Sequence, residues 1–285
     1  MHWEPGDDWT ALTAGTGVSN GGVWRTPDGF VVKRLVPGVE RPAHYAYWRR
    51  QAEVARSGLL ESTLGLRAPR CLKVETDPAG IAVWTEAVDT TDLEPMELAE
   101  ALGRFALNAL EPAPWFARGI LRDRLANDEG RGGWSALASV PALAPELRQV
   151  CGQLWERRAD VMTELDRLPQ QVIHGDAHPL NLLRRTGREV VAADWEQFGT
   201  GPVGFDPAYL ALSTDHPVTE VVGGYQAGSG GLWPVEVVRR GVVLVAAVTL
   251  VARAAWSLGQ PEPGDHLERL VQQAEVVAEA VSHLS

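Results

Sequence analysis

The chain has 285 residues, of which 45% are apolar, so it can form one large domain or two modest ones. Its formal net charge of −11 argues against nucleic acid and anionic membranes as partners. Cys71 and Cys151 are the only cysteines, which argues against a disulfide framework and favours the cytoplasm. The N-terminus lacks the apolar core of a signal peptide, and the longest apolar run, 242–252, is too short to span a bilayer.

The first third of the chain is predicted to form antiparallel strands with one inserted helix. A glycine-rich loop, "GTGVSNGG", is followed by the turn signal "PDG" and the β-prone run "FVVKRLV". In residues 43–57, Tyr45, Trp48 and Ala52 recur at helical spacing, and Gly58 suits the end of a helix. The segments "RCLKVE" and "IAVWTE" flank the turn "TDPAG" and predict a β-hairpin.

Beyond residue 88 the pattern becomes mainly helical. Residues 145–168 carry an apolar stripe that opens with Pro145 at a favourable first helical position. Residues 235–283 are predicted to be helical except at "GQPEPGD", whereas the weak periodicity of residues 119–143 indicates a loop or an inserted cap. The predicted class is α+β, with a boundary between a β-rich and a helical part near residues 85–90.

The segment "QQVIHGDAHPLN" has the strongest chemical character in the chain. A short strand is predicted to run into a loop that carries Asp176 and Asn181, and the hairpin "LLRRTGREVVAADW" then returns Asp194 toward both. Two carboxylates and one carboxamide are hard oxygen donors of the kind that suits Mg²⁺. The Asp-x-x-x-x-Asn spacing is that of the protein-kinase catalytic loop, where the Asp takes a hydroxyl proton and the Asn holds Mg²⁺.

"HGDAHPLN" followed by "ADWE" resembles the aminoglycoside phosphotransferase and choline kinase family, relatives of the protein kinases. The resemblance implies a bilobal protein-kinase-like fold, with a nucleotide-binding lobe over 1–87 and a helical catalytic and substrate-binding lobe over 88–285. It implies that Asp176 is the catalytic base and that Asn181 and Asp194 hold Mg²⁺. In "GFDPAYLAL", Asp206 would brace the catalytic loop, while Leu210 stands where the family often has another Asp.

The same resemblance implies a nucleotide site for ATP or GTP. The glycine loop is similar to the family's phosphate loop, so Gly17, Ser19 and Asn20 would lie over the phosphates. Lys33, one of only two lysines in an Arg-rich chain, would contact the α- and β-phosphates. The family also expects a helical Glu to pair with this lysine, and Glu53 is the only acid in the predicted helix. In the hinge-like "WTEAVD", backbone groups near Glu86 and Val88 would meet the purine.

Other polar and aromatic residues have more ordinary interpretations. His174 is expected to orient the loop by hydrogen bonds, and His178 to be a turn residue beside Pro179. Four tryptophans fall in the predicted substrate-side regions, where packing is the default and stacking on a sugar or base ring is the alternative: Trp115, Trp134, Trp233 and Trp256.

The sequence therefore predicts a Mg²⁺-dependent small-molecule O-phosphotransferase, a monomer or homodimer, that uses ATP or GTP. The expected acceptor is an antibiotic or a related sugar or nucleoside natural product, with resistance by inactivation as the role. One alternative is a metabolic kinase of a sugar, amino alcohol or amino acid. A nucleotide-binding pseudokinase regulator is another, against which the intact Lys, Asp, Asn and Asp set argues. Only 11 residues separate Asp194 from Asp206, which leaves little room for the activation segment of a protein kinase.

Overall fold

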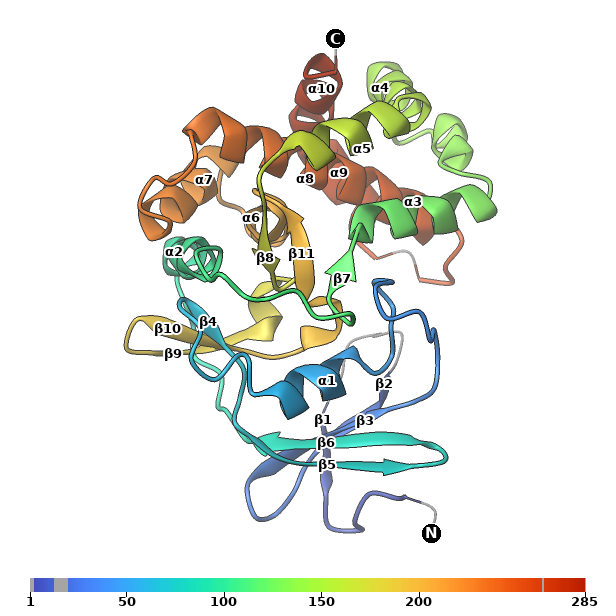
Figure 1. Ribbon diagram of the computed structural model, residues 1–285. Coiled ribbons are helices and arrows are strands. Elements are labelled where there is room, and N and C mark those ends of the chain that lie inside the picture. The colour runs from blue at the N-terminus through green and yellow to red at the C-terminus, as the bar shows by residue number, and fades with distance from the viewer. Residues whose placement is uncertain (1–2, 13–19, 263, 285) are drawn as a thin grey trace.

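The computed structural model of the chain describes residues 3–12, 20–262 and 264–284. A five-stranded antiparallel sheet with one helix forms one end of the molecule, and a mainly helical part forms the other (Figure 1). The sheet has the order β1-β2-β3-β6-β5, and its strands are β1 (Thr10–Leu12), β2 (Asn20–Arg25), β3 (Phe30–Leu35), β5 (Cys71–Asp77) and β6 (Gly80–Glu86). The predicted hairpin and the predicted strand around Lys33 are thus confirmed.

Helix α1 (Arg50–Ser57) packs on β5 and β6 and also contacts the turn that contains Trp195. A small apolar core holds it there, and Leu35, Ala52 and Ile81 are its fully buried centre. Lys33 lies two residues before Leu35, so the alternation of a strand directs both side chains to the face of the sheet that α1 covers. Lys33 therefore lies where the sheet, α1 and the C-terminal part meet.

The helix predicted over 43–57 is shorter than expected, because residues 43–49 form turns and α1 begins at Arg50. The guanidinium of Arg50 donates hydrogen bonds to the carbonyls of Pro42, His44 and Tyr45. The His44 carbonyl also accepts the N–H of Tyr47 within a turn, so these residues form turns held by Arg50 rather than a regular helix. Gly58 ends α1 in the left-handed conformation, as predicted.

Two small sheets join the parts. One has the order β4-β10-β9, with β4 (Leu66–Arg67), β9 (Leu182–Thr186) and β10 (Glu189–Ala192). The other has the order β7-β11-β8, with β7 (Ala117–Arg118), β8 (Gln170–Ile173) and β11 (Gly199–Pro202). Because β4 pairs with β10, a segment from the first third of the chain is part of the sheet next to the loop that carries Asp176.

The remaining helices are α2 (Pro95–Phe105), α3 (Ile120–Gly130), α4 (Pro145–Glu156), α5 (Arg158–Arg167), α6 (Phe205–Ala211), α7 (Val218–Gly228), α8 (Val235–Ser257), α9 (His266–Gln272) and α10 (Ala274–Ser282). Most of them pack on the long, largely buried α8, whereas α2 packs mainly on α7 and α4 on α10. The helical predictions for 145–168 and 235–283 are confirmed. Residues 119–143, predicted as a loop or an inserted cap, contain α3, so the loop alternative is wrong for residues 120–130. The buried Ile120, Leu121 and Leu125 of this helix are too few to make a clear stripe. None of the described helices is long and apolar enough to cross a membrane.

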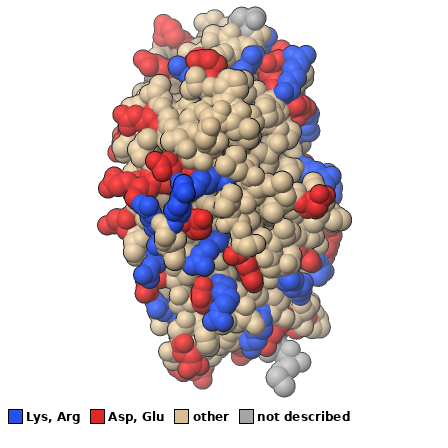
Figure 2. Space-filling view, turned by 60° about the vertical axis from the view of Figure 1, so that its left-hand side comes forward, with Lys and Arg blue, Asp and Glu red and all other residues tan. Residues whose placement is uncertain are grey.

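The surface carries charges of both signs. On the described part of the face in Figure 2, Lys and Arg side chains lie interspersed with Asp and Glu, and neither sign forms a broad patch.

Candidate active site

The loop after β8 is held by one buried carboxylate. Asp206, in the first turn of α6, accepts the N–H of His174 at 2.8 Å and the N–H of Gly175 at 2.9 Å. Burial raises the pKa of this carboxyl, while the two N–H groups and His174 act in the opposite direction. The bracing role expected of Asp206 is confirmed, and it defines the backbone path that leads into Asp176.

The residue before Asp176 must be glycine in this structure. Gly175 has φ of +85°, and a Cβ atom there would lie 2.4 Å from the carbonyl oxygen of Gln197. The catalytic loop thus lies directly against the segment that follows Asp194.

His174 also connects the loop that carries Asp176 with the segment around Asp194. Its Nε2 lies 2.8 Å from the carbonyl oxygen of Ala193 and therefore donates, while its Nδ1 accepts the N–H of Asp176 at 3.2 Å. Its ring also packs on Trp195, with the centroids 4.4 Å apart. His174 is fully buried, so it orients the site without reaching a substrate, as the sequence predicted.

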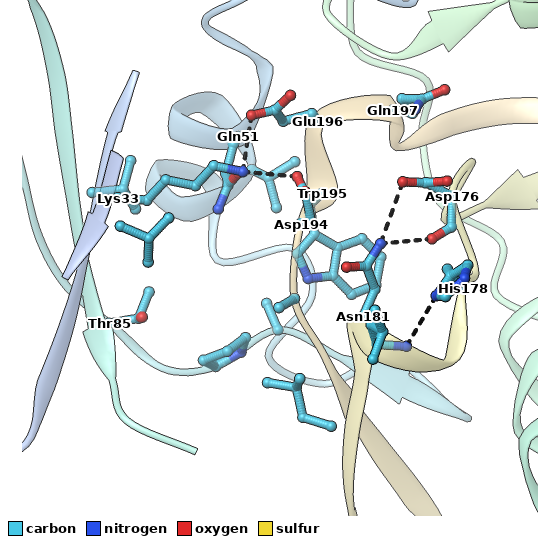
Figure 3. Close-up of a pocket in the computed structure, with 18 of the residues that line it drawn as sticks. Lys33, Gln51, Thr85, Asp176, His178, Asn181, Asp194, Trp195, Glu196 and Gln197 are labelled. Carbon is cyan, nitrogen blue, oxygen red and sulfur yellow. Dashed lines mark hydrogen bonds and ion pairs between the residues drawn. The ribbon is translucent and has the colours of Figure 1, made fainter. Parts of the chain in front are cut away.

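Asn181 is oriented by Asp176. Its Nδ2 donates to the backbone oxygen of Asp176 at 3.0 Å and to the Oδ2 of the same residue at 3.3 Å. The amide oxygen of Asn181 consequently points away from Asp176, toward the side of the cleft where Asp194 lies (Figure 3). The short 3₁₀ turn η2 (Pro179–Asn181), capped by His178, sets this five-residue spacing.

Asp194 follows β10 in an unusual backbone conformation. Its φ of 59° makes it the one non-glycine residue of the described chain with a positive φ. The carboxylate points to β3, where the Nζ of Lys33 lies 2.8 Å from Oδ1 of Asp194 and 2.9 Å from Oε1 of Glu196. Burial alone would lower the pKa of Lys33, but the two carboxylates outweigh it and hold that pKa above its ordinary value.

Glu53 does not pair with Lys33, so the prediction of that pair was wrong. The carboxylate of Glu53 lies 3.6 Å from Arg56, on a side of α1 away from the lysine, and the second acid at Lys33 is Glu196. Gln51 is the residue of α1 that lines the cleft, and its buried Oε1 has no hydrogen-bond partner among the described residues.

A cleft of about 900 Å³ unites these groups. At the end next to the sheet its walls are largely apolar and include Val23, Val31 and Val83 together with the predicted hinge residues Glu86 and Val88. Such a wall suits the flat face of a purine. Gly17 and Ser19 lie outside the described residues, and Asn20 begins β2 with a side chain that is likewise not described.

Arg50 was not anticipated from the sequence. Its side chain is fully buried, and its guanidinium donates to five backbone carbonyls, those of Pro42, His44, Tyr45, Trp115 and Glu196. Burial lowers its pKa to about 10, so it remains charged at neutral pH. It lies four residues before the buried Val54, and this helical spacing was the available signal for a buried position.

Of the four tryptophans considered from the sequence, one lines the cleft. Trp115, Trp134 and Trp233 pack against neighbouring rings of Phe116, Trp155 and Tyr225, respectively. Trp256, near the end of α8, is 42% exposed and faces the cleft beside His266.

Comparison with known proteins identifies the family. The family model described as "Phosphotransferase enzyme family" (APH) matches residues 10–239. The chain belongs to this family, and the predicted class, a phosphotransferase with a hydroxyl acceptor, is confirmed. No curated protein gives a significant sequence match.

Solved structures share the fold at low sequence identity. A choline/ethanolamine kinase family protein from Mesorhizobium loti has a TM-score of 0.64 and 18% identity, over 97% of this chain and 90% of its own. The GDP complex of wild-type aminoglycoside 2'-phosphotransferase-IIIa has a TM-score of 0.63 and 16% identity, over 96% and 92%. An aminoglycoside phosphotransferase from Alicyclobacillus acidocaldarius has a TM-score of 0.56 and 17% identity, over 96% and 91%. The predicted protein-kinase-like α+β fold is thereby confirmed.

Proposed function

We propose that this protein transfers the γ-phosphoryl group of ATP or GTP to a hydroxyl group of a small molecule. The observation that carries this proposal is the convergence of Lys33, Asp194, Asn181 and Asp176 along one cleft (Figure 3). Lys33 comes from the sheet and the other three from the loops around β9 and β10, so the set joins the two parts of the molecule. Residues 1–87 would then bind the nucleotide and residues 88–285 the acceptor.

The acceptor chemistry is assigned to Asp176. Its carboxylate takes the proton of the acceptor hydroxyl as the oxygen forms a bond to the γ-phosphorus. The bond between that phosphorus and the bridging oxygen breaks, and the nucleoside diphosphate leaves. Asn181 keeps the carboxylate in position through its hydrogen bond to Oδ2, and Asp206 holds the loop backbone beneath it.

Binding of the nucleotide phosphates is assigned to Lys33 and the residues around it. The ammonium of Lys33 would contact the α- and β-phosphates as a compact point charge. The glycine loop with Gly17, Ser19 and Asn20 would cover them, and backbone groups near Glu86 and Val88 would meet the purine. The ion pairs of Lys33 with Asp194 and Glu196 hold the ammonium toward the cleft.

The oxygen donors of the site fit Mg²⁺. The amide oxygen of Asn181 and the carboxylate of Asp194 are hard ligands, and no cluster of three or more His, Cys, Asp and Glu side chains that would bind a metal unaided occurs in the described chain. Such a partial set suits an ion that completes its coordination with phosphate oxygens and water. Bound there, Mg²⁺ would neutralise phosphate charge during the transfer.

The acceptor is proposed to be a hydroxylated natural product. Solved structures with this fold include a gentamicin complex and a streptomycin–ATP complex of other phosphotransferases, so antibiotics belong among the compounds to be tested. If the acceptor is an antibiotic, its phosphorylation would confer resistance by inactivation. A metabolic sugar, amino alcohol or amino acid is the alternative within the same reaction class.

A screen of hydroxylated compounds with ATP and with GTP, read by mass spectrometry for gain of one phosphoryl group, tests the proposal. We expect product that requires both nucleotide and Mg²⁺ and that disappears in Asp176→Asn. Failure of the wild-type protein to bind either nucleotide would overturn the proposal.

A further inference from the structure

The end of the cleft beyond Asp176 is lined by residues from three helices of the C-terminal part. Arg124 comes from α3, Arg253 and Trp256 from α8, and His266 from α9. Lys33 and the apolar wall for the purine lie at the other end, next to the sheet. An acceptor whose hydroxyl reaches Asp176 would therefore extend among these side chains, which makes them the acceptor end of the cleft.

Arg253 carries an uncompensated positive charge. Its guanidinium lies 5.3 Å from the centroid of the Tyr209 ring, and no carboxylate or hydrogen-bond acceptor of the described chain pairs with it. The side chain is half-buried, so water solvates it only in part. A guanidinium in such a place gains most from a planar anion, because its fork of N–H groups matches a carboxylate or a phosphate.

Arg124 adds a second such charge. It donates to the hydroxyl of Tyr209 and, at 2.7 Å, to Oε1 of Gln197, both of which are neutral groups. Gln197 packs against Gly175, so this guanidinium is tied to the backbone just before Asp176. Arg124 and Arg253 both lie over the ring of Tyr209, and two guanidinium groups thus converge on one side of the catalytic loop.

The acids near this end are few and already engaged. Of the acidic residues that line the described cleft, Asp194 and Glu196 pair with Lys33, and Glu86 belongs to the hinge wall. Asp176 is the one acid left to face the acceptor. Outside the lining, Asp123 pairs with Arg41, and Asp265 pairs with Arg269.

His266 also lines the acceptor end. Burial and Arg253 lower its pKa, which disfavours a positive charge on this ring. The positive charge of the acceptor end therefore comes from Arg253 and Arg124, and Asp176 supplies the one negative charge.

We infer that the acceptor carries an anionic group, a carboxylate or a phosphate, in addition to the hydroxyl that is phosphorylated. Arg253 and Arg124 bind the anion, Asp176 receives the hydroxyl, and the exposed face of Trp256 covers the carbon skeleton. A polycationic aminoglycoside is disfavoured, because its ammonium groups would meet two arginines and a single carboxylate. This inference rests on the proposed function and narrows its substrate class.

Nucleotide binding is measured first, so that a failure of the proposed phosphotransferase function can be told apart from a failure of the anionic-acceptor inference. Wild-type protein and Asp194→Asn are compared for binding of a non-hydrolysable ATP or GTP analogue and for slow nucleotide hydrolysis without acceptor. If wild type neither binds nor hydrolyses nucleotide, the proposed phosphotransferase function fails. If it does both, the acceptor experiment tests the charge of the acceptor alone.

Acceptor binding is then compared between compounds that differ in charge. Gluconate and sorbitol share a carbon skeleton, as do glucose 6-phosphate and glucose, and kanamycin represents the polycations. Each is titrated into the protein saturated with the analogue, with calorimetry as the readout, which keeps the phosphate-binding lysine occupied. We expect gluconate or glucose 6-phosphate to bind at least about tenfold more tightly than its neutral partner and than kanamycin. A preference for gluconate would indicate that the anionic group is a carboxylate, and a preference for glucose 6-phosphate would indicate a phosphate.

Three variants test whether the arginines are responsible. Arg253→Gln and Arg124→Gln should each weaken the binding of the preferred anion about tenfold or more, and Arg253→Glu should weaken it further and improve kanamycin binding. Arg239→Gln on α8 and Arg122→Gln on α3 are matched controls, because these arginines pair with Glu279 and Asp166 away from the cleft. Tighter binding of kanamycin than of both anions, no binding of either anion, or equal effects of site and control variants would overturn the inference.

Discussion

The Nζ of Lys33 lies 2.8 Å from Oδ1 of Asp194, although 161 positions separate the two residues in the chain. Lys33 has a second carboxylate within 2.9 Å, and it comes from Glu196, two residues after Asp194, rather than from α1. One short segment therefore supplies both counter-charges to the lysine. If Asp194 holds Mg²⁺ in the nucleotide complex, as proposed above, Glu196 would remain as the partner that keeps the ammonium in the cleft.

Replacement of Glu196 by Gln should raise the KM and Kd for nucleotide about tenfold, because the lysine loses a buried charge partner. Glu53→Gln is the matched control, since Glu53 pairs only with Arg56 at 3.6 Å, and its Kd should stay within about twofold of wild type. Nucleotide titrations of the two variants check this. A larger effect at Glu53 than at Glu196 would contradict the assignment.

Replacement of Asp176 by Asn should lower kcat by about 10²–10⁴-fold, the usual contribution of a positioned proton acceptor. Nucleotide binding should be retained, because Asp176 lies on the side of Asn181 away from Lys33 (Figure 3). Steady-state kinetics together with direct nucleotide binding separate the two effects. Asp166→Asn, at an exposed residue that pairs with Arg122, serves as the control and should behave as wild type.

Removal of Arg50 should cost stability as well as activity. Arg50→Met leaves five backbone carbonyls without their donor, including that of Glu196 at 2.5 Å, and should lower the free energy of unfolding by about 2–4 kcal/mol. Arg49→Met removes an exposed pair with Glu40 and a cation–π contact with the Trp48 ring, and it should cost less than about 1 kcal/mol. Urea denaturation measures both, and equal losses would show that the buried network contributes little.

Acid should destabilise the protein partly through His178. Its pKa is lowered from 6.5 chiefly by burial, and its Nδ1 accepts the N–H of Leu180 at 3.2 Å, which requires an unprotonated nitrogen. The folded state therefore binds the proton less readily than the unfolded state. The corresponding stability is present above the ordinary pKa and is lost as the pH falls through the folded pKa.

The measurement is the free energy of unfolding of wild type and His178→Gln from about pH 8 to about pH 5. The wild-type value should fall more steeply than that of the variant over this range. His44 and His266 also have lowered pKa values, so the variant should still lose some stability in acid. Parallel curves for the two proteins would contradict the contribution of His178.

The sequence alone identified the segments that act through local geometry. The spacing of Asp176 and Asn181 corresponds to one short 3₁₀ turn, and the hairpin before Asp194 is encoded by alternation and a turn signal within a dozen residues. Asp206 was identified by resemblance, and the structure confirms its contacts with the loop. The turn and the hairpin depend on near neighbours in the chain, and so a pattern in the sequence can report them. The contacts of Asp206 span about 30 positions, and only the family motif pointed to them.

The tertiary structure decided which distant groups meet. Glu53 and Glu196 were both available to Lys33, and the structure pairs the lysine with Glu196, because α1 packs with Gln51 rather than Glu53 toward the cleft. The acceptor end likewise gathers Arg124, Arg253 and His266 from helices far apart in sequence. Sequence spacing indicates only which side chains share one face of a helix or strand. The packing of helices and strands against each other determines which charged groups face one another across a cleft.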